Sequence, residues 1–300
     1  MEPGFFQECL FAALRAARAA GDAILTVYHG EFDVEYKEDH SPLTVADRRA
    51  HTVIKEHLAA DERFEGIPLL SEEGRSIPYE VRSRWDHFWL VDPLDGTKEF
   101  VKRLDEFTVN IALIQAGKPI LGVVLVPAKG LLYYGLQGLG SYKVKRPDAV
   151  PDLVEGLAKA SGRDALVRAL LDGSDRLPLR RAGCKEKDPL TVIGSRSHGT
   201  EALGAFVQQA ERRFGEVALI SAGSALKFAL VAEGIADIYP RFGPTMEWDT
   251  AAGQCLVEQS GGTVVELGAQ IPLVYNKREL LNPHFICRAA HCLHLPYPLE

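Results

Sequence analysis

The stretch Trp89-Leu90-Val91-Asp92-Pro93-Leu94-Asp95-Gly96-Thr97 decides how the chain is interpreted, because an apolar run leads directly into two carboxylates. The run before Asp92 predicts a buried strand, which we expect to end at Asp92-Pro93 because proline cannot continue a ladder. Gly96 then permits an unusual backbone conformation, and Thr97 adds a hydroxyl. Carboxylates at a rigid strand end suit Mg²⁺ and phosphate. Asp-Pro and Asp-Gly are also common turn dipeptides, so this stretch alone leaves both interpretations open.

The composition is that of a globular protein rather than of a membrane or nucleic-acid-binding one. The 300 residues, 46% hydrophobic and 25% charged, suffice for one large domain or two medium-sized ones. The formal net charge of −7 argues against a nucleic-acid partner and agrees with a cation-binding acidic site. No run approaches the roughly 18 apolar residues of a membrane-spanning helix. The acidic start of the chain does not have the basic region of a signal peptide.

We therefore expect a cytoplasmic protein with reduced cysteines. A peripheral position at the inner face of the cell membrane stays open as an alternative, although no basic amphipathic stretch predicts one. No apolar stripe predicts an oligomeric state. Four ligand-type residues lie together near the C-terminus, but their spacing matches no usual zinc pattern, so we expect no zinc at Cys287, His291, Cys292 and His294.

Residues 1–145 predict an α+β half. Apolar residues at helical spacing indicate a helix over residues 5–28 and a second one from Ser41, as N-cap, to about Leu58. Short β-forming runs follow, and a turn at Gly117-Lys118-Pro119 favours antiparallel pairing. The expected strands cover residues 33–36, 68–71, 88–91, 108–114, 121–126 and 131–134.

Residues 146–190 are rich in glycine, proline and aspartate, and we interpret them as an insertion or connector with little site chemistry. Residues 191–300 predict an α/β half, because strands and helices alternate there. Its last helix begins at Trp248, with Asp249 as the expected N-cap. The expected strands are 191–194, 217–221, 235–239, 264–265 and 273–274, and the earlier helices are 201–212 and 224–233.

Four carboxylates stand at the end of a predicted strand or the start of a predicted helix: Glu72, Asp92, Asp95 and Asp249. Each has an ordinary structural explanation as a turn or capping residue. Together, and without clustered lysines, histidines or cysteines, they suit Mg²⁺ rather than zinc. Two such ions about 3.5–4 Å apart would clamp the attacking and leaving oxygens of a phosphoryl displacement. Backbone groups at Gly96 and Thr97 would add donors to the phosphate.

Three segments carry a family resemblance: Leu70-Ser71-Glu72-Glu73, the opening stretch, and Trp248–Gly253. They resemble the signature segments of the inositol monophosphatase-like, lithium-sensitive phosphatases, and the chain is most similar to the bacterial 3′(2′),5′-bisphosphate nucleotidases among them. The resemblance implies a layered αβαβα sandwich, with an antiparallel sheet in the first half and a mixed sheet in the second. Residues 146–190 and the tail after Arg288 depart from the pattern. Further matching segments are Ser41–Asp47, Asp92–Phe100, Phe107–Ile114, Leu226–Phe228, Tyr239–Thr245 and Leu281–Pro283.

Carried over by position, the resemblance implies that two or three Mg²⁺ ions bind Glu72, Asp92, Asp95, Asp249 and the carbonyl of Leu94. It also implies that Asp47 and Thr97 orient and deprotonate the attacking water, a plausible role for such a pair. A helix-terminus role is the ordinary alternative for Asp47. The same resemblance implies that the substrate contacts Glu72, Asp95, Gly96, Thr97 and Asp249.

The second half would determine substrate preference. By resemblance, Ser195 and His198 contact the adenosine, while Gly223 and Lys227 hold the second phosphate or the ribose. A helix start is the alternative for His198, and a solvated face is the alternative for Lys227. The implied reaction converts adenosine 3′,5′-bisphosphate to AMP and phosphate, with the sulfated analogue as a further substrate. Two other functions stay open: an inositol or sugar monophosphatase, and a non-catalytic nucleotide or metal sensor.

Overall fold

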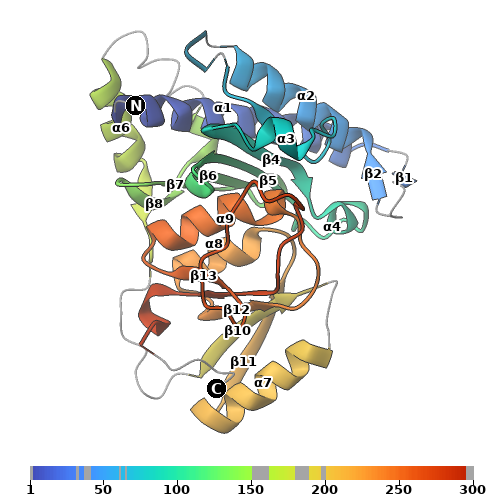
Figure 1. The fold of residues 1–300 in the computed structure, drawn as a ribbon, viewed down its shortest axis with the longest axis vertical. Helices are drawn as coiled ribbons and strands as arrows, with labels where there is room; N and C mark the ends of the chain where they lie inside the picture. Colours follow the sequence, from blue (N-terminus) through green and yellow to red (C-terminus); the bar gives the residue numbers. More distant parts are fainter. Residues whose placement is uncertain are drawn as a thin grey trace.

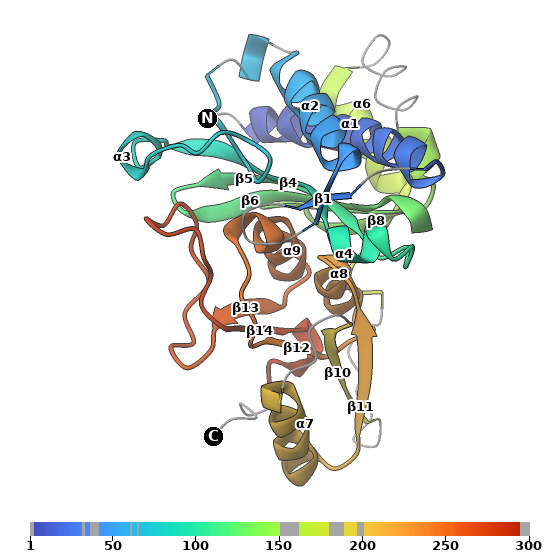
Figure 2. The ribbon, with the colours of Figure 1, turned by 90° about the vertical axis from the view of Figure 1, so that its right-hand side faces the viewer.

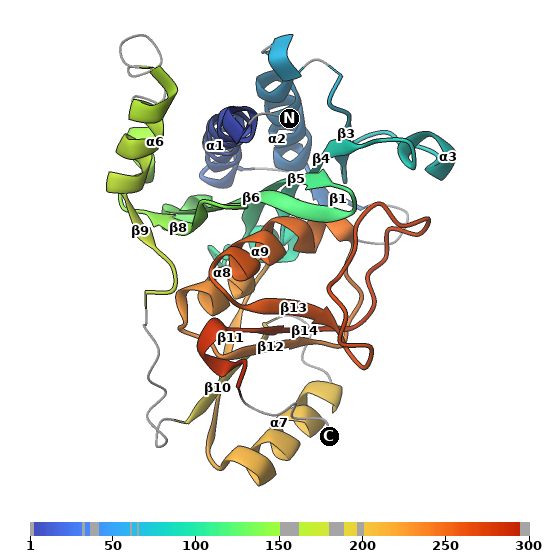
Figure 3. The ribbon, with the colours of Figure 1, turned by 60° about the vertical axis from the view of Figure 1, so that its left-hand side comes forward.

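Five alternating layers of helices and sheets make up the structure, a computed structural model (Figures 1 and 3). It describes residues 3–31, 34–36, 42–60, 62–64, 66–150, 162–179, 189–196 and 201–294. Helices α1, α2 and α6 cover one face of a seven-stranded sheet, and α8 and α9 cover its other face. A five-stranded sheet follows, with α7 outside it. The layered sandwich expected from the sequence is therefore confirmed.

The first sheet has the strand order β3-β4-β5-β6-β7-β8-β9. Its neighbours are antiparallel except β3 and β4, which run parallel. A separate two-stranded ribbon, β1 with β2, precedes it. The bounds are β1 Val34–Tyr36, β2 Pro42–Thr44, β3 Leu69–Ser71, β4 His87–Asp95, β5 Thr108–Gln115, β6 Lys118–Val126, β7 Leu131–Leu136, β8 Gly140–Val144 and β9 Ser174–Arg176.

Helix α1 is long because apolar and small residues recur at helical spacing along one face, which is buried with α2 against this sheet. The expectation of a helix over residues 5–28 is confirmed. The helical bounds here are α1 Pro3–Tyr28, α2 Val45–Ala59, α3 Tyr79–Arg82, α4 Thr97–Val101 and α6 Gly162–Asp172. Short 3₁₀ turns occupy Glu62–Phe64, Pro127–Lys129, Pro147–Ala149 and Ala290–Cys292.

The second sheet is mixed, with the strand order β11-β10-β12-β14-β13. Strands β10, β11 and β12 run parallel to one another, whereas β14 is antiparallel to both of its neighbours. The bounds are β10 Leu190–Ser195, α7 Glu201–Phe214, β11 Val217–Ala222, α8 Leu226–Glu233, β12 Ile238–Arg241, α9 Glu247–Gln259, β13 Thr263–Glu266 and β14 Phe285–Arg288.

Helix α9 lies directly on the first sheet, and a glycine makes this approach possible. A Cβ atom added to Gly122 of β6 would come within 2.4 Å of the Ala252 carbonyl oxygen. Only hydrogen fits at that position, so the backbones of β6 and α9 can touch. The position of α9 matters because its first turn carries Asp249.

Four local expectations were wrong. Strand β4 does not end at Asp92: Asp92 pairs with Asn110 and Asp95 with Thr108, so Pro93 and Leu94 form a bulge that accommodates the missing proline N–H. Helix α2 begins at Val45 with Thr44 as its N-cap, and Pro42 belongs to β2. Asp249 is the third residue of α9, whose N-cap is Met246.

The fourth wrong expectation is the strand at residues 273–274, where no strand forms; β14 completes the sheet instead. The interval interpreted as a connector contributes α6 and also β9, which pairs with β8 and extends the first sheet. In the part of the chain that the structure describes, no helix is both long and apolar enough to cross a membrane.

Candidate active site

Parallel pairing of β3 with β4 brings Glu72 beside Asp92. Ser71 lies opposite Val91, and the N–H of Glu72 donates to the Val91 carbonyl at 3.1 Å. Asp92 is buried, and one of its carboxylate oxygens accepts a hydrogen bond from the Leu94 N–H at 3.0 Å. The bulge in β4 then turns Asp95 toward β5, where Thr108 Oγ1 and Asn110 Nδ2 donate to its Oδ2 at 3.4 and 3.3 Å.

Asp249 reaches the same place from α9. Its Oδ2 accepts the Met246 N–H at 2.9 Å, which fixes the side chain across the first turn of the helix. Burial raises the pKa of Asp249 well above its usual range, and the neighbouring Asp95 charge raises it further. Burial also raises the pKa of Asp92, with added repulsion from Glu72, Asp95 and Asp249. The four carboxylates of the sequence prediction therefore converge.

Burial raises the pKa of Asp95 to about 6, although the positive charge of Lys227 opposes the shift. Like charges buried together are costly unless a cation or a proton compensates them. The donor groups are carboxylates and the Leu94 carbonyl, all of them oxygen, and this is the set that Mg²⁺ prefers. The residues present therefore fit a magnesium site at Glu72, Asp92, Leu94, Asp95 and Asp249.

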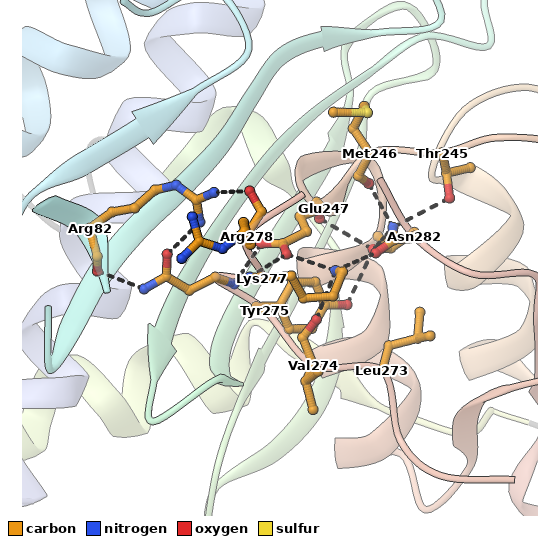
Figure 4. A network of polar contacts seen from close by, with 12 residues as sticks. Arg82, Thr245, Met246, Glu247, Leu273, Val274, Tyr275, Lys277, Arg278 and Asn282 are labelled. Atoms are coloured by element: carbon orange, nitrogen blue, oxygen red, sulfur yellow. Dashed lines mark hydrogen bonds and ion pairs between the residues drawn. The ribbon is translucent and has the colours of Figure 1, made fainter. Parts of the chain in front are cut away.

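A polar network holds the start of α9 in place (Figure 4). Glu247 is fully buried and accepts the N–H groups of Asn276 and Lys277 at 2.6 and 2.9 Å, and Lys277 Nζ at 2.7 Å. Asn282 donates to the Met246 carbonyl at 2.8 Å and to Thr250 Oγ1 at 3.0 Å. Because these bonds surround the first turn of α9, they determine where Asp249 lies.

Asp47 and Thr97 meet at the edge of the carboxylate group. Thr97 Oγ1 lies 3.3 Å from Asp47 Oδ1 and 3.4 Å from the Leu94 carbonyl oxygen. The other Asp47 oxygen accepts the N–H and the hydroxyl of Thr44 at 2.8 and 2.7 Å. Burial raises the pKa of Asp47 to about 6; hydrogen bonds from Thr44 oppose this, and the Glu73 charge adds to it. Asp47 thus completes the capping box of α2, whose N-cap is Thr44, and also contacts Thr97.

A cavity of about 290 Å³ opens beside these groups. Asp95, Gly96, Thr97 and Asp249 are among the residues that line it. Strands β10, β11 and β12 contribute further lining residues, because they are parallel and their C-terminal ends meet at one edge of the sheet. Residues at or just beyond these ends line the cavity: Ser195, Ser224, Lys227, Tyr239 and Arg241.

Lys227 is not on a solvated face, since only 4% of it is exposed. Its Nζ donates to the Ser224 carbonyl at 2.6 Å and to the Ala222 carbonyl at 3.4 Å, and it lies 5.4 Å from the centre of the Tyr239 ring. Burial lowers the pKa of Lys227 to about 8, although Asp95 opposes the shift. The lysine is therefore held at the wall of the cavity, near the carboxylates.

Of the two glycines expected to contact the substrate, Gly96 lines the cavity and Gly223 does not. Gly96 lines the cavity with φ 88°, the left-handed conformation expected of a glycine. Gly223 is not among the residues that line the cavity, and its N–H donates to Glu106 Oε2 at 2.9 Å, so that group is engaged within the protein. Ser195 lines the cavity. His198 lies outside the described residues.

Sequence reasoning assigned no role to Ser224 or Arg241. The Ser224 hydroxyl is buried, lines the cavity and has no hydrogen-bond partner among the described residues. Arg241 donates from Nη2 to the Pro244 carbonyl at 3.0 Å, while its buried Nε has no partner there. A signal for Arg241 existed: it is a cation at the end of a predicted strand, within the quoted segment Tyr239–Thr245.

The residues near the C-terminus form a separate group. His291 Nε2 lies 2.7 Å from Asp237 Oδ1, and Cys292 Sγ is close to both side chains. The other Asp237 oxygen accepts the Thr191 N–H at 2.6 Å. These bonds fasten the turn after β14 to β10 and β12, away from the cavity, while Cys287 is buried within β14.

Comparison with known proteins places this geometry in a family. The inositol monophosphatase family matches residues 6–294. The chain is 46% identical over 272 residues to the 3′(2′),5′-bisphosphate nucleotidase CysQ of Salmonella typhimurium, covering 90% of this chain and 95% of that one. CysQ of Escherichia coli is 45% identical over 272 residues, with the same shares of each chain covered.

Solved structures of related proteins agree with this family assignment. CysQ from Bacteroides thetaiotaomicron, described as a bacterial member of the inositol monophosphatase family, has 44% identity and a TM-score of 0.81, with 95% of this chain and 98% of that chain covered. An inositol monophosphatase from Anabaena shares the fold, with 22% identity and a TM-score of 0.65 over 96% and 92% of the chains. Enzymes of this family depend on metal ions, generally Mg²⁺. The chain belongs to the inositol monophosphatase family.

Proposed function

We propose that the protein is a Mg²⁺-dependent phosphatase that hydrolyses the 3′-phosphate of adenosine 3′,5′-bisphosphate to give AMP and phosphate. The position of Lys227 is the main support for this function: a buried lysine lies at the wall of the same cavity as Asp95 and Asp249. Relatives named 3′(2′),5′-bisphosphate nucleotidases, about 46% identical, agree with it.

The acidic end of the cavity would hold the 3′-phosphate. Glu72, Asp92, Asp95, Asp249 and the Leu94 carbonyl would bind two or three Mg²⁺ ions, which would supply positive charge to the phosphate and make a bound water more acidic. The attacking water would pass its proton to the Thr97 hydroxyl, which would pass its own proton to Asp47. Thr97 Oγ1 lies 3.3 Å from Asp47 Oδ1. The water oxygen would then bond to phosphorus as the bond from phosphorus to the 3′ oxygen breaks, and the 3′ oxygen would take up a proton from solvent to give the 3′ hydroxyl of AMP. No covalent enzyme intermediate is needed.

The other end of the cavity would hold the 5′-phosphate. Lys227 and Arg241 both line the cavity, and hydrogen bonds to backbone carbonyls orient the charged group of each side chain. A substrate with a single phosphate would leave Lys227 and Arg241 without an anionic partner, which favours a bisphosphate. Ser195 offers a hydrogen bond to the same end, and so does the Ser224 hydroxyl, which has no partner in the part of the chain that the structure describes. The sulfated analogue carries the same charges at that end and is proposed as a second substrate.

A phosphate-release panel with Mg²⁺ tests the proposal. It compares adenosine 3′,5′-bisphosphate, its 5′-phosphosulfate analogue, inositol 1-phosphate and fructose 1,6-bisphosphate. We expect the adenosine bisphosphate to have the highest kcat/KM. A higher value for inositol 1-phosphate would replace the proposed substrate. Binding of the nucleotide in Mg²⁺ without any phosphate release would instead indicate a sensor.

A further inference from the structure

Glu106 lies in the loop before β5 and is 7% exposed. Its carboxylate accepts four hydrogen bonds from three different segments. Arg196 donates Nε to Oε2 at 2.8 Å and Nη2 to Oε1 at 3.0 Å, Lys129 Nζ donates to Oε1 at 3.1 Å, and the Gly223 N–H donates to Oε2 at 2.9 Å. Burial raises the pKa of Glu106, but these bonds outweigh it and hold that pKa below its usual range. Glu106 is therefore ionised at neutral pH.

The backbone of Glu106 is packed just as closely between two glycines. A Cβ atom added to Gly223 would come within 2.6 Å of the Glu106 carbonyl oxygen, and one added to Gly96 within 3.3 Å of it. The same added atom on Gly96 would lie 3.2 Å from Ser224 Cβ. Glu106 thus sits where the loop after Asp95 meets the loop after β11. Figure 2 shows these two loops at the junction of α4 with α8.

The contacts of Glu106 lead to the cavity by two short routes. The bond to the Gly223 N–H holds the turn at residues 222–224, in which Ser224 has φ 46°. The carbonyls of Ala222 and Ser224 in that turn are the acceptors that direct Lys227 Nζ. Along the other route, Arg196 follows Ser195 directly and also donates to the Ser221 carbonyl at 3.1 Å, which ties the ends of β10 and β11 together.

We propose that Glu106 is a positioning residue that fixes Lys227 relative to the loop after Asp95. It thereby sets the affinity for the second anionic group of the substrate, the 5′-phosphate. The inference rests on the proposed bisphosphate substrate. Glu106 lies outside the set that handles water and metal, so its loss should change substrate binding more than bond cleavage.

Glu233 provides a matched control. It is 2% exposed, accepts Tyr133 Oη at 2.5 Å and Lys143 Nζ at 3.1 Å, and joins α8 to the first sheet. It is therefore also a buried, ion-paired glutamate that links the two halves of the chain. Unlike Glu106, it belongs to the last turn of α8, away from the turn that directs Lys227.

The experiment measures KM and kcat of Glu106→Gln and Glu233→Gln for adenosine 3′,5′-bisphosphate and for adenosine 3′-monophosphate, which lacks the second anionic group. Hydrogen bonds to charged groups contribute enough that we expect Glu106→Gln to raise KM for the bisphosphate about tenfold. We expect kcat to change by less than about threefold and the KM for the monophosphate to change little. Glu233→Gln should lower Tm and leave both KM values unchanged.

Arg196→Gln is a second variant in case Glu106→Gln does not fold. The Arg196 side chain is 43% exposed, so the substitution is tolerated more easily, and we expect the same selective rise in KM, about threefold. The inference about Glu106 is overturned if Glu106→Gln raises KM equally for both substrates, or if Glu233→Gln raises KM for the bisphosphate as much. Either result leaves the proposed function intact. A wild-type enzyme that releases no phosphate from adenosine 3′,5′-bisphosphate overturns the proposed function and the inference with it.

Discussion

Thr97 Oγ1 lies 3.3 Å from Asp47 Oδ1, although 50 positions separate the two residues in the sequence. The contact joins the first turn of α2 to the first residue of α4, just after β4, and these two side chains form the proton-accepting pair of the proposed mechanism. Asp47 is held on its other oxygen by Thr44, which leaves Oδ1 directed at Thr97.

Asp47→Asn should lower kcat by a factor of about 100 to 10,000, the usual contribution of general base catalysis. Thr97→Val should lower kcat as well, and the double variant should be little worse than Asp47→Asn, because the two side chains act on one proton. Steady-state kinetics of the three variants measure this coupling. Fully additive losses would show that Asp47 and Thr97 act independently.

Asp95→Asn should reduce turnover at least about 100-fold in saturating Mg²⁺, because it removes a negative charge from the proposed metal site. The fold should persist, since the asparagine can still accept the bonds from Thr108 and Asn110. Asp175→Asn, at an ion pair with Lys145 that is about half exposed, is the control and should keep wild-type activity. An active Asp95→Asn enzyme would contradict the metal assignment.

Mg²⁺ should stabilise the protein more at about pH 7.5 than at about pH 5. Burial raises the pKa of Asp95 to about 6, from 3.8, and raises those of Asp92 and Asp249 too. An acid whose pKa is raised on folding holds a proton that the unfolded chain has released. The metal-free folded state therefore loses stability as the pH rises from about 4 through about 6.

Mg²⁺ replaces those protons, so its effect on Tm should be small where the carboxyls are still protonated and large where they are charged. Thermal unfolding with Mg²⁺ and with a chelator, at both pH values, measures the difference. Equal Tm shifts at the two pH values would mean that Mg²⁺ binds elsewhere. The Asp95→Asn variant should show a reduced shift at the higher pH.

Lys227→Gln should raise KM for adenosine 3′,5′-bisphosphate by about 10- to 100-fold, because a buried charge is lost opposite the proposed 5′-phosphate. The KM for adenosine 3′-monophosphate should change much less. Lys143→Gln removes a lysine charge from the pair with Glu233, away from the cavity, and should leave both KM values unchanged. Equal effects of Lys227→Gln on the two substrates would place the second phosphate elsewhere.

Asn282→Ala should lower the free energy of unfolding by about 1–3 kcal/mol, because it leaves buried partners at the start of α9 without hydrogen bonds. Activity should fall with it, since the first turn of α9 carries Asp249 (Figure 4). Urea unfolding and kcat measure the two effects. Arg278→Gln, at an exposed ion pair with Glu80, should change neither quantity detectably. Unchanged stability of Asn282→Ala would show that the network does not support the helix.

Much of the fold follows from local patterns. Helix α1 and the hairpin of β5 and β6 were predictable, because apolar periodicity reflects which face is buried. The bulge at Pro93 was not: proline normally ends a strand, and only the pairing of Asp92 and Asp95 with β5 shows that the strand continues. Strand β14 was missed for a similar reason, since its place depends on β12 and β13 on either side of it.

The types of residue in the candidate site could be derived from the chain itself: acids at strand ends and helix starts, a glycine that turns the backbone, a threonine beside it. Their chemistry indicates an oxygen-ligand metal site wherever they lie. Tertiary structure alone decided which of them meet and which side chains face the cavity from the second half. Glu106 shows why, because its partners Arg196 and Gly223 lie 90 and 117 positions away. Contacts over such separations depend on how the sheets pack, and no local pattern in the sequence encodes that packing.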